Sequence, residues 1–140
     1  MSSIEKIVAD YETCKKAWNI GLRIESVFSY YENSTVVSTL VRLAQSNNLF
    51  IDGCELFSAP TAEEVPLPKT INLAENARSF LWFNKSGRAY YLLEGFVTHQ
   101  ADNVTPKDNE ATVRLMMAIW LIENVPEAKQ WYKKMGVLHV

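Results

Sequence analysis

The apolar stretch from Phe80 to Thr98 is interrupted only once by a cluster of turn-forming residues. This pattern predicts a β-hairpin in which residues 80–83 form one strand and residues 89–97 form the other. Gly87 can take the positive φ that closes a three-residue loop after a type I turn. That loop sets a register with Phe83 opposite Ala89 and Trp82 opposite Tyr90. Both faces of the hairpin are apolar, so both must be covered by other parts of the chain or by a partner.

The first third of the chain carries apolar residues at spacings of three and four, which is typical of amphipathic helices. Residues 3–18 are predicted to form a helix capped by Ser3. Residues 19–32 are read as a continued or restarted helix near Gly21, although the alternation of apolar residues at 20, 22 and 24 also fits a strand. A second helix is predicted from Ser34 or Thr35 to position 45, on the repeat of apolar residues at 37, 40, 41 and 44.

Residues 49–58 favour β structure, because Asp52-Gly53 is a strong turn dipeptide between two short apolar arms. The segment forms either a hairpin or one strand with a bulge. Three prolines in residues 59–72 predict a long loop, since proline lacks a backbone donor and fixes φ. Residues 73–81 are predicted to form a short helix that leads into the hairpin.

The C-terminal part predicts two helices. The polar residues 99–108 read as a loop, after which Asp108 or Asn109 caps a helix that is apolar on all sides between positions 115 and 122. This pattern indicates the central helix of the core. Pro126 fits the first turn of a following helix and Gly136 fits its end. The tail from position 137 to 140 is expected to dock in an extended form.

These elements predict an α+β fold with a small antiparallel sheet packed against the N-terminal and C-terminal helices. The sheet would combine the hairpin at 80–98 with the strand or hairpin at 49–58. The 140 residues fit one domain, residues 1–140, and a domain of this length buries enough surface to fold without disulfides or metal.

Charge and composition disfavour several classes of function. The net charge is −2 and no Lys/Arg run exceeds two residues, so a phosphate-neutralising face for nucleic acid is not expected. Cys14 and Cys54 have no metal-ligand or disulfide-framework spacing and are read as buried free thiols. The N-terminus shows no signal-peptide pattern and no apolar run is long enough for a bilayer, which predicts a cytoplasmic protein.

The chain carries few residues that could perform chemistry. No metal site, cofactor site or catalytic residue is predicted, because the histidines and cysteines are scattered and phosphate-binding glycine motifs are absent. A small enzyme or small-ligand protein is the alternative hypothesis. Its pocket would lie near Glu94, His99 and Asp102, with Cys54 as the nucleophile.

The aromatic hairpin is the strongest functional signal, because aromatic residues dominate the energetics of protein–protein contacts. We therefore expect a non-catalytic protein-binding module of the adaptor, inhibitor or immunity type, which acts through the hairpin and the adjacent proline-rich loop. Its partner would be another protein, with a homodimer through the same hairpin as a variant. The predicted binding residues are Trp82, Phe83, Lys85, Arg88, Tyr90, Tyr91, Glu63 and Glu64.

Overall fold

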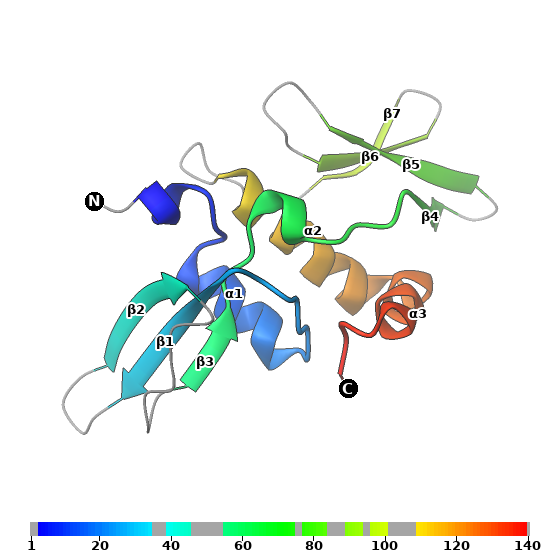
Figure 1. Ribbon diagram of the computed structural model, residues 1–140. Helices are drawn as coiled ribbons and strands as arrows, with labels where there is room; N and C mark the ends of the chain where they lie inside the picture. Colours follow the sequence, from blue (N-terminus) through cyan, green and yellow to red (C-terminus); the bar gives the residue numbers. More distant parts are fainter. Residues whose placement is uncertain are drawn as a thin grey trace.

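The computed structural model describes residues 3–34, 39–45, 55–74, 77–83, 89–93, 96–100 and 109–139. It has an α+β fold, as predicted, in which two antiparallel sheets lie on different sides of the C-terminal helices (Figure 1). The helices are η1 (Ser3–Lys6), α1 (Tyr11–Asn19), η2 (Ala62–Glu64), α2 (Glu110–Asn124) and α3 (Pro126–Met135). The strands are β1 (Phe28–Ser34), β2 (Thr39–Gln45), β3 (Glu55–Ser58), β4 (Thr70–Ala74), β5 (Ala77–Phe83), β6 (Ala89–Leu93) and β7 (Phe96–Gln100).

The N-terminal segment contains two short helices where the sequence predicted one. Ser3 begins a 3₁₀ helix that ends at Lys6, and the cap of α1 is Asp10, whose carboxylate accepts the Thr13 N–H at 2.8 Å. Between the two helices the chain extends, and the Ala9 N–H donates to the Pro60 carbonyl at 2.9 Å. Long-range backbone pairing and an alternative cap therefore override the helical periodicity.

The first sheet has the order β2-β1-β3 and replaces two predicted helices. The helix expected within 19–32 is wrong, because residues 20–27 form no helix and β1 begins at Phe28. The helix expected from position 34 or 35 to 45 is also wrong where the chain is described, since residues 39–45 form β2. In β1, Ser29 and Tyr31 are buried on one face and Tyr30 and Glu32 on the other. A strand buried on both faces lacks the polar alternation that identifies a strand in sequence.

The second sheet has the order β4-β5-β6-β7 and contains the predicted hairpin. Its register is as predicted, with Phe83 opposite Ala89 and Trp82 opposite Tyr90. Three predictions around it are wrong. Residues 89–97, predicted as one strand, contain β6 and the start of a separate strand β7. The short helix predicted at 73–81 is replaced by the end of β4 and by most of β5. His99, predicted in a loop, lies in β7. The strand at 55–58 pairs with β1, so it belongs to the other sheet.

The two C-terminal helices form as predicted. The Asn109 side chain caps α2 by accepting the Thr112 N–H at 2.8 Å, and its amide also donates to the Val8 carbonyl at 2.7 Å. Pro126 occupies the first turn of α3, and Gly136 ends that helix with a left-handed φ of 85°. Helix α2 is buried on several sides, as its apolar sequence predicted. Among the described residues, no helix is long and apolar enough to cross a membrane.

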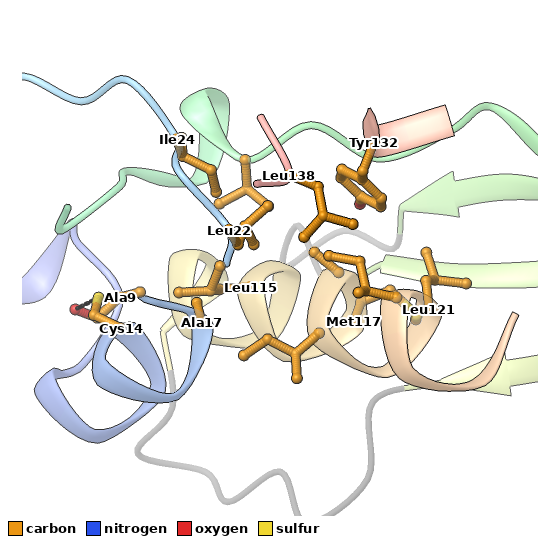
Figure 2. Packing of buried hydrophobic residues seen from close by; sticks show 14 of the residues in the cluster. Ala9, Cys14, Ala17, Leu22, Ile24, Leu115, Met117, Leu121, Tyr132 and Leu138 are labelled. Atoms are coloured by element: carbon orange, nitrogen blue, oxygen red, sulfur yellow. Dashed lines mark hydrogen bonds between the residues drawn. The ribbon is translucent and has the colours of Figure 1, made fainter. Parts of the chain in front are cut away.

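The C-terminal tail closes the core against residues 21–23. Leu138 pairs with Leu22 in an isolated antiparallel bridge, and the His139 N–H donates to the Gly21 carbonyl at 2.8 Å. Figure 2 shows Leu138 between Leu22 and Tyr132, above the side chains of α2. The predicted extended docking of the tail is therefore confirmed for residues 137–139, and Val140 lies outside the described residues. Gly21 has a φ of 95°, and a Cβ there would collide with the His139 carbonyl oxygen.

Candidate functional site

The packing of Leu81 identifies which face of the β5–β6 hairpin meets the helices. Successive residues of a strand alternate between faces, so the pairing of Leu81 with Tyr91 places these two positions on one face. Leu81 packs against the buried core, and Ile71 of the neighbouring strand, opposite Ser79, is 1% exposed. The face that contains Leu81 is therefore the face directed at the helices.

The register divides the predicted binding residues between these faces. Positions 82 and 90 are paired on the face opposite Leu81, together with the pair formed by positions 80 and 92. Phe83 and Tyr91 share the face of Leu81. Lys85 and Arg88 lie outside the described residues. The sequence predicted the register but contained no signal for which face would meet the helices.

The two predicted loop carboxylates have different environments. Glu63 is exposed, whereas Glu64 binds three groups from two segments of the chain. Its carboxylate accepts the Thr61 N–H at 2.9 Å, the Ser26 hydroxyl at 2.9 Å and the Val27 N–H at 3.0 Å. Glu64 therefore fixes the start of the proline-rich loop to the segment before β1. The spacing from Thr61 to Glu64 is that of a capping box, which could have revealed this role in the sequence.

The residues of the enzyme hypothesis are mostly outside the described part of the chain. Cys54, Glu94 and Asp102 belong to undescribed segments, and His99 lies in β7 opposite Tyr91. That hypothesis remains a prediction. Within the described ranges, no group of three or more histidine, cysteine, aspartate or glutamate residues could hold a metal ion.

A polar cluster that the sequence did not predict joins α1 to β1. The Glu32 carboxylate accepts the Tyr11 hydroxyl at 2.6 Å and the Lys15 ammonium at 3.0 Å. Glu32 is 5% exposed, while the side chain of Lys15 is 42% exposed and connects the cluster to solvent. No local pattern predicts this cluster, because the apolar spacing within 19–32 favours a helix there and Glu32 becomes buried only in the sheet.

The hydrogen bonds of this cluster favour the protonated forms of its two donors. The hydrogen bond to Glu32, followed by burial, raises the pKa of Tyr11. The pKa of Lys15 is also raised, first by its hydrogen bond to Glu32 and then by that to Tyr11. At neutral pH the cluster therefore holds a neutral phenol and a charged ammonium, which is the state expected of a structural anchor.

Two further groups, one on α1 and one on β1, are buried and share one hydrogen-bond acceptor. The Cys14 thiol and the Tyr30 hydroxyl both donate to the Ala9 carbonyl, at 3.4 Å and 3.0 Å. Burial raises the pKa of the Cys14 thiol and of the Tyr30 hydroxyl far above their ordinary values. A thiol held in its protonated form is a poor nucleophile, so Cys14 is the buried free thiol that the sequence predicted.

The described surface contains a groove between α1 and α2 with a volume of about 490 Å³. Its floor is apolar and its rim is charged. The residues that line it are Glu12, Thr13 and Lys16 of α1 and Met116, Ile119, Trp120 and Glu123 of α2. This volume lies within the range of roughly 300–1,000 Å³ that is typical of ligand sites.

A second, smaller groove of about 270 Å³ lies between α3 and the start of β4. Ile71 and Ala128 contribute buried apolar surface, and Trp131 is partly exposed at its side. The groove therefore combines apolar residues with polar and charged ones beside β4.

Comparison with known proteins gave no match. No protein-family model, no curated protein and no solved structure matches the chain.

Proposed function

We propose that this protein is a non-catalytic protein-binding module, of the adaptor, inhibitor or immunity type, that docks a protein partner on the outer face of the β5–β6 hairpin. The observation that carries the proposal is the register of that hairpin. The backbone pairs Trp82 with Tyr90 and Phe80 with Leu92, at positions that alternate with Leu81 along β5.

The composition of this outer face suits protein recognition. Tryptophan and tyrosine are enriched among the residues that contribute most to binding energy, because they bury a large apolar area and keep a polar group for a hydrogen bond. A paired sheet also holds such residues in fixed relative positions, which reduces the conformational entropy lost on binding. These residue types support a role of this face in protein recognition.

The end of the adjacent proline-rich loop lies beside β5. The Leu81 N–H donates to the Lys69 carbonyl at 2.7 Å, which fixes the end of that loop to β5. Lys69 and Glu63 are exposed, whereas Glu64 is engaged within the fold. In this proposal the aromatic face supplies most of the binding energy and the exposed loop charges contribute to specificity.

The neighbouring tyrosines 90 and 91 allow a matched test, because they are the same residue type on opposite faces. A photoreactive phenylalanine analogue replaces either residue, and the protein is irradiated in an extract of its source cells. We expect cross-links from position 90 to one recurrent protein, and cross-links from position 91 to this chain's own helices. Equal yields of cross-links to other proteins from the two positions, or no such cross-link from position 90, would contradict the proposal.

Light scattering over a concentration series separates a foreign partner from a second copy of the chain. The protein has a mass of 16.0 kDa, and we expect this value at every concentration if the partner is another protein. A mass of about twice that value would assign the same face to a homodimer.

A further inference from the structure

The groove between α1 and α2 has the chemistry of a site for a cationic side chain. Its floor is formed by Ile119, which is 3% exposed, and by the partly exposed Met116 and Trp120. Its rim carries two carboxylates, Glu12 and Glu123, and a single ammonium, Lys16. The lining therefore has an excess of one negative charge above an apolar floor.

The ammonium of Lys16 neutralises this rim only weakly. Its distance to the nearer Glu123 carboxylate oxygen is 3.8 Å, and the two side chains are 61% and 44% exposed. An exposed ion pair of this length contributes little energy, because water screens both charges. Both carboxylates can therefore accept hydrogen bonds from an incoming cation.

We propose that this groove binds an arginine side chain presented by a peptide segment of a partner protein. The three methylene groups of arginine would cover Met116 and Trp120, and its guanidinium would lie between Glu12 and Glu123. Arginine suits the groove better than lysine, because its planar guanidinium is weakly hydrated, packs on aromatic rings and donates in a fork that matches carboxylates.

The protein already contains one contact of this kind. The Arg23 guanidinium carbon lies 3.6 Å from the ring centroid of Trp18, and its Nη1 donates to the Trp18 carbonyl at 2.7 Å. The lining of the groove includes the same residue types, an indole in Trp120 and oxygen acceptors in Glu12 and Glu123. The proposed arginine site involves only α1 and α2, so a negative result for this site would leave the proposal for the outer sheet face unaffected.

The test uses the peptide acetyl-Leu-Arg-Leu-amide and the same peptide with neutral citrulline in place of arginine. Binding is followed by the NMR signals of the Met116 methyl and the Trp120 indole N–H. We expect saturable shifts with the arginine peptide and affinity at least about threefold weaker with citrulline, since loss of the charge removes both ion pairs. Equal affinity for the two peptides, or no shift at either probe, would overturn the inference.

Three variants of the rim and one control sharpen the test. Glu12→Gln and Glu123→Gln should each weaken arginine binding by about two- to fivefold, which is the range for exposed ion pairs. Lys16→Met should strengthen it, because it keeps an apolar side chain and releases Glu123. Glu127→Gln is the matched control, since Glu127 is an exposed glutamate at the other groove. An equal loss with Glu127→Gln would also overturn the inference.

Discussion

Helix α1 forms two interfaces with different chemistry. Toward the first sheet it places Tyr11 and Lys15 against the buried carboxylate of Glu32, beside the aromatic rings of Tyr30 and Phe57. Toward α2, the small side chains of Cys14 and Ala17 lie near Leu115 around a void of about 10 Å³ (Figure 2). The interface with α2 is stabilised by the packing of apolar side chains. The interface with the sheet also depends on the hydrogen bonds that Tyr11 and Lys15 donate to Glu32.

This difference predicts different responses to substitution. In the apolar interface, the cost of a substitution follows the volume removed, because the cavity left behind collapses only partly. In the polar interface, the loss of stability depends on which hydrogen-bond partner remains. A buried donor left without an acceptor destabilises the fold, whereas removal of both partners has a smaller effect. The following predictions test that contrast, beginning with the largest expected effect.

Leu115→Ala tests the apolar side. Leu115 is 1% exposed, and its truncation should lower the free energy of unfolding by about 3–5 kcal/mol. Urea denaturation measures the change. Ile7→Ala is the control, because Ile7 is 51% exposed and should cost less than about 1 kcal/mol. Similar losses of unfolding free energy for both variants would contradict the difference between the buried core and the surface.

Gly21→Ala tests the docking of the tail on this apolar side. The added Cβ meets the His139 carbonyl oxygen at a positive φ, so we expect a loss of about 2–3 kcal/mol in thermal or urea unfolding. Gly136→Ala is the matched control, because Gly136 has a similar φ but nothing lies within 4 Å of its Cβ position. It should cost about 1 kcal/mol. A smaller loss at Gly21 than at Gly136 would contradict the tail's position.

Glu32→Leu tests the polar side. The change leaves the Tyr11 hydroxyl without its acceptor, and we expect a loss of about 1–3 kcal/mol. The double variant Tyr11→Phe with Glu32→Leu removes both groups and should recover part of that loss. Urea denaturation of the single and double variants forms a double-mutant cycle. Strictly additive losses would show that the two groups do not interact.

The smallest effect is expected from alkaline pH. The folded-state pKa values of Tyr11 and Lys15 are raised above their ordinary values of 10.0 and 10.5. Their stabilising contribution is therefore complete below those values and is lost as the pH rises through the higher folded-state pKa values. Unfolding curves at about pH 8 and pH 11 should show lower stability at the higher pH, with a smaller change in the double variant. An increase in stability would contradict the assigned hydrogen bonds.

The elements that the sequence predicted correctly are those with strong local signals. Asn109, Pro126 and Gly136 marked helix ends by their own backbone chemistry, and the Asn84–Gly87 turn predicted the pairing of Trp82 with Tyr90. Each of these depends on residues close together in sequence. Local chemistry alone was therefore sufficient for the second sheet's hairpin and for both C-terminal helices.

The first sheet could not be predicted in this way. The burial of Glu32 and Tyr31 on opposite faces of β1 reflects neighbours far away in the chain, and Val41 fits a helical stripe as well as a strand. The candidate site has the same limitation. The register of residues 90 and 91 followed from the turn, but the face that meets the helices is identified by the packing of Leu81. The groove between α1 and α2 combines residues about 100 positions apart and has no local sequence signal.

The functional proposal depends on the difference between the two faces of the β5–β6 hairpin. Hydroxyl-radical footprinting of the isolated protein measures that difference directly, because tyrosine is oxidised in proportion to its solvent exposure. Tyr90 should be oxidised several times faster than Tyr91 in the folded protein, and the two rates should become equal after denaturation. Equal rates in the folded protein, or faster oxidation of Tyr91, would contradict an outer face that is available to a partner.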